Sequence, residues 1–398
     1  MRICGITAEY DPFHNGHLYQ LEETARAGAD RIIAVISSSF TQRGDAGCMT
    51  KFRRAEAAAK GGADLVLELP APYSLASAER FAEGAVSVLT AAGCDSISFG
   101  SESADLPALR RAAALAGDAG VLAETRRISE TLGIPFPAAR TQALSALDPD
   151  AAKLLARPND LLAAEYIRAC TRLQQQPELI AVPRKNVLHD SAGSSGGFAS
   201  ASQVRSLIAS KTDYRDLVPD STFRIIEEER SAGHLSLGLA AAERAVLFTL
   251  REKTKDAICA APGCADGLGA RLYNTLSEAS SLEELYALTK TKRYTMTRVK
   301  RAVLCAALGI GSSLQEAPVP YLRVLAVGKH GRELLSDIAS RSSLPVSQSL
   351  SALGKTSDTA RAFCECEQAA YELYCMTMQS PAGRGENRPK IYVYDEVH

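Results

Sequence analysis

Two histidines flank a glycine near the start of the chain, in the string H-N-G-H from His14 to His17. The string follows a short apolar run, Ile3–Ala8, and precedes a segment of helical spacing at 16–26. Ligands bind at the carboxyl ends of strands in an open parallel sheet, and the first amides of a helix attract phosphate. Gly16 would let a nucleotide lie against the backbone, and each imidazole could donate a hydrogen bond to charge developing on a phosphate. The spacing therefore predicts a nucleotide-activating turn. A chance match on a surface turn is the alternative, expected on the order of once in a hundred chains of this size.

Apolar or β-branched runs recur through the N-terminal part and alternate with segments of helical spacing. After Ile3–Ala8, such runs lie at Arg31–Ser37, 64–67 and 96–99, and another follows at 179–183. Strands that alternate with helices are typical of βαβ units, in which helices cover both faces of a parallel sheet. The sequence therefore predicts an α/β fold whose first strand carries the H-x-G-H turn.

Beyond residue 210 the pattern becomes mainly helical. Helical spacing occurs in segments at 239–253, 268–277, 281–289, 295–308 and 322–328. The stretch 107–174 is also helical, with breaks at 133–135 and 157–160. We expect two domains, an α/β catalytic domain at 1–210 and a mainly α-helical domain at 211–398.

Composition and charge are those of an ordinary globular protein. Apolar residues make up 46% and charged residues 23%, and no apolar run approaches the roughly 20 residues that cross a bilayer. The N-terminus lacks a basic region followed by a long apolar core, so a cytoplasmic location without membrane attachment is expected. The net charge of −1 excludes binding to nucleic acid through overall charge but allows local basic clusters.

Ten cysteines are scattered along the chain, many of them in apolar or helical segments. This distribution suits reduced thiols that pack as small hydrophobic side chains. Cys364, Cys366 and Cys375 come closest to a metal-binding group, but C-x-C followed nine residues later by a lone cysteine matches no zinc pattern. No metal site is expected.

The setting of H-N-G-H resembles the H-x-G-H signature of the nucleotidyltransferase superfamily, whose members activate substrates by attack on the α-phosphate of a nucleotide. The fuller string E-Y-D-P-F-H-N-G-H-L-Y is similar to one branch, the tRNA(Met) cytidine acetate ligase family. Further strings similar to that branch follow in order: F-T-Q-R-G-D at 40–45, K-F-R-R at 51–54, D-L-V-L-E-L-P at 64–70, F-G-S-E at 99–102, R-P-N-D at 157–160, P-R at 183–184, S-A-S-Q-V-R at 200–205, K-T-K-R-Y-T at 290–295 and V-P-Y-L-R at 319–323. The resemblance covers most of the chain.

This resemblance implies a Rossmann-like nucleotidyltransferase domain with a parallel sheet, followed by a mainly helical C-terminal domain that contributes to tRNA binding. It implies that acetate and ATP give acetyl-adenylate and pyrophosphate, and that the acetyl group then passes to the wobble cytidine of elongator tRNA(Met), forming N4-acetylcytidine. The implied substrates are ATP with bound Mg²⁺, acetate and this tRNA. Binding to DNA or to a membrane is not expected. Two other interpretations stay open: another H-x-G-H adenylyltransferase acting on a small-molecule coenzyme precursor, and a non-catalytic tRNA-binding protein.

The resemblance also implies which residues bind ATP, with His14 and His17 as the catalytic pair. The implied ATP-binding residues are Thr7, Ala8, Glu9, Tyr10, Asp11, Pro12, Phe13, His14, Asn15, Gly16, His17, Leu18, Tyr19, Gln20, Gly100, Asn159 and Arg184. Gly100 ends a predicted strand at the ligand edge of the sheet, which supports its role. Asn159 is also a natural N-cap for the helix after Pro158. On the sequence alone, a lone arginine such as Arg184 is more often a solvated surface charge, and only the resemblance assigns it to the ATP site. The family usually has P-N-N where this chain has P-N-D at 158–160, so the second amide is lost.

Three further residues are candidates for contact with the triphosphate. Ser202 and Arg205 lie in the first turns of a predicted helix, Ala201–Ser210, after a glycine-rich polar loop at 190–197 that is predicted to be mobile. A hydroxyl, helix amides and a guanidinium there would neutralise a leaving pyrophosphate. Lys51 begins another predicted helix and could contact the same phosphates, although an exposed basic first turn explains it equally well.

The implied chemistry asks the protein for positioning and charge stabilisation. Acetate itself attacks the phosphate, so no residue is expected to act as a covalent nucleophile. Mg²⁺ would neutralise phosphate charge, but the sequence has no dedicated carboxylate cage for it. Glu9 and Asp11 are the nearest acidic candidates.

The clearest basic cluster lies at 290–301, in the string K-T-K-R-Y-T-M-T-R-V-K-R. Its candidate tRNA contacts are Lys290, Lys292, Arg293, Arg298 and Lys300, and Tyr294 among them could stack on a base. Composition alone favours the solvated face of a helix, and the tRNA substrate that the resemblance implies favours contact with RNA.

Overall fold

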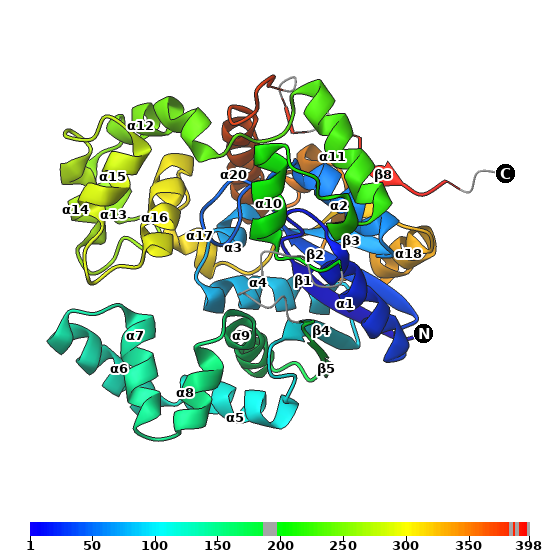
Figure 1. Ribbon diagram of the computed structural model, residues 1–398, viewed down its shortest axis with the longest axis horizontal. Coiled ribbons are helices and arrows are strands. Elements are labelled where there is room, and N and C mark those ends of the chain that lie inside the picture. Colours follow the sequence, from blue (N-terminus) through cyan, green and yellow to red (C-terminus); the bar gives the residue numbers. More distant parts are fainter. Residues whose placement is uncertain (186–196, 382–384, 387–389, 396–398) are drawn as a thin grey trace.

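The computed structural model describes residues 1–185, 197–381, 385–386 and 390–395, so the predicted loop at 190–197 lies outside it except for Gly197. An eight-stranded sheet in the order β5-β4-β1-β2-β3-β6-β7, with β8 paired to β6, forms the centre of the molecule (Figure 1). The strands are β1 (Ile3–Ala8), β2 (Arg31–Ser37), β3 (Leu65–Leu69), β4 (Ser96–Ser101), β5 (Glu178–Pro183), β6 (Leu322–Val327), β7 (Val346–Ser347) and β8 (Tyr392–Val393).

The five N-terminal strands are parallel, and the direction in which the chain adds strands to the sheet changes once. The chain places β2 and β3 on one side of β1 and then returns to place β4 and β5 on the other side. The switch point therefore lies between β1 and β4. In open α/β sheets the crevice outside the carboxyl ends of the strands at this point is where ligands bind. The predicted α/β fold with a parallel sheet is confirmed, and its switch point coincides with the H-x-G-H turn.

Side chains of the central strands alternate between two apolar layers. In β2, Ile32, Ala34 and Ile36 enter one layer, whereas Ile33 and Val35 enter the other. The first layer contains residues of α1 (Asn15–Arg26), α2 (Lys51–Lys60), α10 (Ala201–Ser210), α11 (Asp220–Ala232) and part of α20 (Asp358–Cys375). The same apolar cluster continues into α12 (Glu243–Arg251), α13 (Lys255–Cys259), α14 (Leu268–Thr275), α15 (Leu282–Thr289) and α16 (Met296–Leu308), which form a helical group beside the sheet (Figure 1). The sheet is thus buried on both faces, as its near-continuous apolar strands require.

Helices on the opposite face include a group that extends away from the sheet beside β4 and β5 (Figure 1). This layer contains α4 (Ala78–Ala91), α5 (Leu106–Gly117), α6 (Ala119–Leu132), α7 (Phe136–Ser145), α8 (Pro149–Leu155), α9 (Pro158–Arg172), α18 (Gly331–Arg341) and α19 (Leu350–Leu353), and the short α3 (Ala71–Ser74) and α17 (Ser312–Glu316) complete the helices. Gly133, at φ 62°, ends α6, and α9 begins at Pro158, so both predicted breaks are confirmed.

The predicted helix at 322–328 is wrong, because this segment is strand β6, antiparallel to β3. Every residue of β6 is buried, and periodicity cannot separate a strand buried on both faces from a buried helix. β6, β7 and β8 all come from beyond residue 210, so the sheet crosses the predicted domain division. The division itself stays a prediction. No helix in the described part of the chain has the length and apolarity needed to cross a membrane.

Candidate functional site

A cavity of about 520 Å³ lies at the switch point between β1 and β4. Its wall is built by the loop after β1, the end of β4, the N-terminal ends of α4, α9 and α16, and part of α7. A smaller cavity of about 50 Å³ shares His17, Gln20, Gly100 and Arg184 with it. Elements far apart in the sequence therefore meet over the H-x-G-H turn.

The two histidines hold each other in place at the start of α1. His14 is the N-cap residue, and its Nδ1 accepts a hydrogen bond from the Gly16 amide at 3.0 Å, while Nδ1 of His17 accepts one from the His14 amide at 3.3 Å. The rings stack with their centroids 3.7 Å apart. Because Nδ1 is an acceptor in both rings, each neutral imidazole carries its proton on Nε2. The two rings therefore form one rigid unit, and each carries its N–H group on Nε2.

Both imidazoles are neutral at pH 7. Burial, followed by the charge of Arg184, lowers the pKa of His14 to about 3. Burial also lowers the pKa of His17 well below its usual value, and His14 and Arg184 add to this effect, while the Pro12 carbonyl opposes it. A neutral imidazole can stabilise negative charge on a ligand by donating a hydrogen bond, without giving up its proton. His17 lines both cavities and His14 only the smaller one, so the two rings are not equivalent.

Gly16 is required by the histidines themselves. A Cβ at this position would lie 2.9 Å from Cε1 and 3.0 Å from Nδ1 of His14, closer than real Cβ contacts. A side chain would displace the His14 ring and break the reciprocal cap. The sequence suggested that Gly16 lets a nucleotide approach the backbone. The His14 ring is a second reason why this position needs glycine.

The loop between β1 and α1 is anchored from several directions. The Asp11 carboxylate accepts the Cys48 amide at 2.6 Å and lies 3.4 Å from Arg205, whose Nη1 also donates to the Asp11 carbonyl at 2.6 Å. The Glu9 carboxylate accepts the Gln42 amide at 2.8 Å. Burial raises the pKa of Glu9. These contacts fix the loop that carries the histidines.

Gly100, Asn159 and Arg184 come together on the cavity wall, as the resemblance implied. Arg184 donates to Oδ1 of Asn159 at 3.2 Å, and a Cβ on Gly100 would lie at an ordinary 3.6 Å from Cγ of Arg184. The prediction that Asn159 caps its helix is wrong. Arg157 is the N-cap of α9, and the carboxylate of Glu102 accepts the first amides instead, including that of Asn159 at 3.3 Å. The Asn159 side chain donates to the same carboxylate at 2.6 Å.

Asp160, the residue that departs from the family pattern, is buried and turned away from the cavity. Its carboxylate accepts the Ser103 amide at 3.2 Å and the Ser101 hydroxyl, so it fixes the turn after β4. Asp160 is not among the residues that line either cavity. The loss of the second amide therefore removes no donor from the cavity wall.

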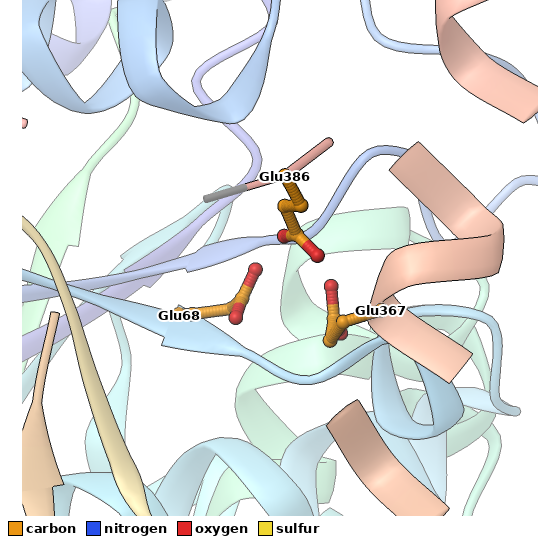
Figure 2. Close-up of side chains that lie close together, drawn as sticks. All are labelled: Glu68, Glu367 and Glu386. Atoms are coloured by element: carbon orange, nitrogen blue, oxygen red, sulfur yellow. The ribbon is translucent and has the colours of Figure 1, made fainter. Parts of the chain in front are cut away.

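Lys51 does not lie on an exposed turn, and that prediction is wrong. Its side chain is fully buried and forms ion pairs with Glu68, Glu367 and Glu386, at 2.8 Å for Glu367. Figure 2 shows the three carboxylates converging from β3, α20 and the C-terminal segment. Lys51 lines neither cavity, so the structure gives no support to its contact with a triphosphate.

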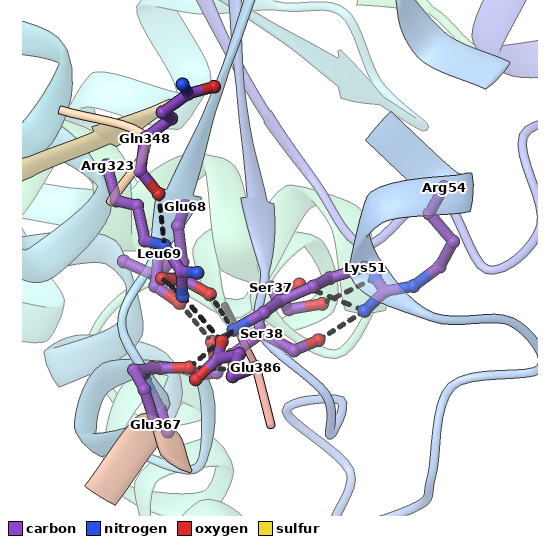
Figure 3. A network of polar contacts seen from close by, with 12 residues as sticks. Ser37, Ser38, Lys51, Arg54, Glu68, Leu69, Arg323, Gln348, Glu367 and Glu386 are labelled. Carbon is purple, nitrogen blue, oxygen red and sulfur yellow. Dashed lines mark hydrogen bonds and ion pairs between the residues drawn. The ribbon is translucent and has the colours of Figure 1, made fainter. Parts of the chain in front are cut away.

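The buried cluster of Lys51, Glu68, Glu367 and Glu386 is connected through α2 to the loop between β1 and α1. Arg54, on the same helix as Lys51, donates to the Glu9 carbonyl at 2.6 Å and to the Ser38 carbonyl. The Ser38 hydroxyl donates to Glu367 at 2.6 Å (Figure 3). These side chains support the loop between β1 and α1 from beneath and line neither cavity.

The other candidates for the triphosphate lie beside the site. Ser200 is the N-cap of α10, and its Oγ lies 3.0 Å from Oγ of the exposed Ser202. Ala201 lines the cavity, so the N-terminus of α10 reaches its wall. Arg205 is held against the loop by Asp11, one turn into the same helix.

The basic segment 290–301 divides into paired and solvent-facing residues. Lys292 and Arg293 are exposed, and no ion pair involves them within the described ranges. Lys300 pairs with Asp45 at 2.7 Å, Arg298 pairs with Asp266 at 3.0 Å, and Lys290 donates to a neighbouring carbonyl. Tyr294 is buried and its hydroxyl donates to the Asp266 carbonyl at 2.6 Å, so the predicted stacking on a base is wrong.

Several residues of the cavity wall were not foreseen from the sequence. They are Gln42, Arg43, Phe136, Arg140, Thr295, Thr297 and Arg301. The string F-T-Q-R-G-D and the basic segment contain most of them, but neither string reveals that it faces the histidines. Only the fold brings α7, α16 and the loop at 40–46 to the same opening.

A cavity at the switch point of a parallel sheet, with two neutral imidazole donors at the start of the first helix, defines a nucleotidyltransferase site of the H-x-G-H class. Comparison agrees, because the HIGH Nucleotidyl Transferase family matches residues 1–388. The tRNA(Met) cytidine acetate ligase of Acetivibrio thermocellus is 34% identical over 96% of this chain and 97% of that protein. The enzyme of the same name from Syntrophotalea carbinolica is 35% identical over 88% and 85%. The chain belongs to the tRNA(Met) cytidine acetate ligase family.

Two solved structures extend the comparison to the whole fold. The apo form of Thermotoga maritima TmcAL superposes with a TM-score of 0.89 at 28% identity, covering 99% of both chains. The form bound with alpha-thio ATP superposes with a TM-score of 0.86 at 29% identity, covering 98% of this chain and 97% of that one. The mixed sheet and its two helical layers are therefore common to both proteins.

Proposed function

We propose that this chain is an ATP-dependent ligase that activates acetate and transfers the acetyl group to the wobble cytidine of elongator tRNA(Met). In the first step an acetate oxygen attacks the α-phosphorus of ATP, the bond to the β-phosphate bridging oxygen breaks, and pyrophosphate leaves. In the second step the cytidine N4 attacks the carbonyl carbon of acetyl-adenylate, AMP leaves, and N4 loses a proton. The product is N4-acetylcytidine. The observation that carries the proposal is the reciprocally capped pair His14 and His17 above the switch-point cavity.

The histidines stabilise charge at the α-phosphate. Their Nε2–H groups donate to phosphate oxygens, and the free amides of α1 add the positive end of a helix dipole. His17, which lines the larger cavity, acts on the reacting phosphate, and His14 holds the ring of His17 and the helix start. Geometry and charge thus do the catalytic work, and no covalent intermediate with the protein is needed.

The remaining nucleotide contacts follow from the cavity wall. The residues from Thr7 to Gln20 wrap the phosphates and ribose, while Gly100 leaves room for the nucleoside beside Asn159 and Arg184. Arg205 and Ser202 lie on the helix whose start receives the leaving pyrophosphate.

Mg²⁺ would come with ATP and be held mainly by phosphate oxygens and water. The two acidic candidates for direct coordination fit poorly. The Asp11 carboxylate is buried and already accepts the Cys48 amide beside Arg205, and Glu9 accepts the Gln42 amide. Bound Mg²⁺ would supply neutralisation of phosphate charge.

The tRNA is proposed to bind over the basic segment, at the solvent-facing Lys292 and Arg293. A tRNA substrate places the proposed reaction in the cytoplasm. All ten cysteines are free thiols, which suits a reducing compartment.

One assay separates this proposal from its alternatives. Labelled pyrophosphate is exchanged into ATP with and without acetate, and labelled acetate is then followed into tRNA. The proposal predicts exchange that depends on acetate and transfer to tRNA carrying the wobble cytidine. Exchange without acetate would favour an adenylyltransferase for a coenzyme precursor, and absence of exchange together with tRNA binding would favour a non-catalytic binding protein.

A further inference from the structure

The wall of the large cavity that α16 and the loop at 40–46 build carries two guanidinium groups, those of Arg43 and Arg301. Arg301 is partly buried, and its Nη1 donates to the Gln42 carbonyl at 3.2 Å. Arg43 is exposed at the tip of the loop. Neither guanidinium has a carboxylate within ion-pair distance in the part of the chain that the structure describes.

Neighbouring cations on this side of the cavity are neutralised. Lys300 pairs with Asp45 at 2.7 Å, Arg298 pairs with Asp266 at 3.0 Å, and Arg140 pairs with Glu165 at 3.3 Å. Among the described residues, Arg43 and Arg301 therefore line the cavity without a carboxylate partner, as does Arg184 near β5. A cation that is removed from water without an anion is unfavourable, and burial lowers the pKa of Arg301. An anionic ligand bound at this wall would supply the missing counter-charge and stabilise the buried guanidinium.

The segment that carries Arg301 points to the kind of anion. Lys292 and Arg293 face solvent just before α16 begins, and Thr295 and Thr297, at its start, line the cavity together with Arg301. One continuous segment thus leads from the molecular surface into the cavity, with cations outside and donors inside. A polyanion lying along it fits this arrangement better than a small carboxylate, which needs no path of cations.

Gln42 joins this wall to the nucleotide loop. Its backbone amide donates to Glu9 at 2.8 Å, and its carbonyl accepts from Arg301. The loop between them is held by the Thr41 amide, which donates to the Asp45 carbonyl at 2.9 Å, and by Gly44, at φ 80°, where a Cβ would lie 2.9 Å from Cβ of Lys300. A phosphate bound at Arg43 and Arg301 would therefore be fixed relative to the loop that carries the histidines.

We propose that Arg43 and Arg301 form a subsite for an RNA backbone phosphate adjacent to the cytidine that receives the acetyl group. The inference rests on the proposed function, because it assigns the second substrate to a particular wall of the same cavity. A cytidine in a single-stranded loop can be turned outward, and guanidinium groups on its flanking phosphate would hold the base toward the adenylate.

The test uses the full-length protein with R43Q, R301Q and R301K, and with R341Q as the matched control. Arg341 is an exposed arginine on α18 that lines neither cavity. A labelled anticodon stem-loop that carries the wobble cytidine is titrated at several salt concentrations, and acetate-dependent pyrophosphate exchange is measured without RNA. We expect R43Q and R301Q each to weaken RNA binding about tenfold and to lower the salt slope by about 0.7.

The variants also separate charge from shape. R301K should restore the salt slope but only part of the affinity, because an ammonium lacks the planar fork of a guanidinium. R341Q should leave RNA binding and exchange as in the wild type. Exchange by R43Q and R301Q is measured in parallel, because RNA takes no part in that step, and retained exchange reports that the variants are folded and bind ATP.

Three outcomes would overturn the proposal. A raised KM for acetate with unchanged RNA binding would assign the two arginines to acetate. Unchanged RNA binding by both glutamine variants would remove the subsite, and equal weakening by R341Q would reduce it to general surface charge. Failure of the wild type to exchange pyrophosphate would refute the proposed function, and RNA titration would still decide whether the arginines bind phosphate.

Discussion

Replacement of Glu367 by glutamine should remove a pH dependence of stability between pH 6.5 and 8. Glu367 is fully buried beside Glu68, Glu386 and Lys51 (Figure 2). Burial, followed by the charge of Glu68, raises the pKa of this carboxyl to about 8, although Lys51 opposes the shift. An unfolded chain titrates its glutamates near pH 4.3. Between these values the folded protein holds a proton that the unfolded chain has lost, so stability falls by about 1.4 kcal/mol per pH unit.

The window from pH 6.5 to 8 separates Glu367 from the site histidines. The pKa values of His14 and His17 are lowered in the fold, so below pH 6.5 the unfolded chain binds protons that the folded protein does not, and stability rises with pH there. Above pH 6.5 the unfolded chain loses its remaining histidine protons, and the small rise in stability that follows is the same in the wild type and in E367Q, so it cancels in their difference. The contribution of Glu367 is complete below its unfolded pKa and is lost by about pH 8, which amounts to about 2 kcal/mol across the window.

Urea unfolding at pH 6.5 and pH 8 measures this difference directly. E367Q keeps the shape of the side chain but cannot ionise, so its free energy of unfolding should change less across the window than that of the wild type by about 2 kcal/mol. E365Q is the matched control, because Glu365 is exposed on the same helix two residues away. A pH dependence in E367Q equal to that of the wild type, or a flattening by E365Q of the same size, would refute the reasoning.

Three further substitutions test the site and its support. His17→Ala should lower the rate of acetate-dependent exchange about 100-fold to 1,000-fold while changing the KM for ATP less than threefold, and a variant with a normal exchange rate would contradict the role of His17. Lys51→Met should destabilise the fold by about 3–5 kcal/mol, because the buried carboxyl groups of Glu68, Glu367 and Glu386 lose their shared ammonium and only the Arg323 guanidinium, which pairs with Glu68 and Glu386, remains. K60M, at the exposed end of the same helix, is the control, and unfolding midpoints of K51M and K60M that are equal would contradict this expectation. Reversal of Lys292 and Arg293 to glutamate should weaken tRNA binding and leave exchange intact, and loss of exchange as well would show that the two duties are not separate.

The chemistry of the first loop could be predicted because its parts are local. A strand, two histidines, a glycine and a helix start follow one another within 1–26, and the structure brings them together as the spacing requires. Gly100 lies on β4, Asn159 lies on α9 and Arg184 follows the end of β5, so their convergence followed from resemblance and not from periodicity.

Lys51 and Tyr294 show why other expectations failed. Glu367, which accepts a hydrogen bond from Lys51, lies 316 residues further along the chain, and local composition shows only a lysine at a helix start. Tyr294 sits among exposed cations in the sequence, yet its ring is buried and its hydroxyl is used by the Asp266 carbonyl. Burial of a polar side chain depends on partners that only the tertiary fold supplies.

Residues after 210 complete the sheet and the buried cluster around Lys51 that begin in the first 210 residues. β6 covers the edge of β3 that would otherwise present unpaired backbone groups. Without α20 and the C-terminal segment, Lys51 would retain only Glu68, and Ser38 would lose its acceptor. Arg54, on the same helix as Lys51, donates to the Glu9 carbonyl, so the position of the loop depends on how α2 is held. The histidine loop thus rests on side chains from both ends of the sequence. Its geometry belongs to the whole chain and not to residues 1–210 alone.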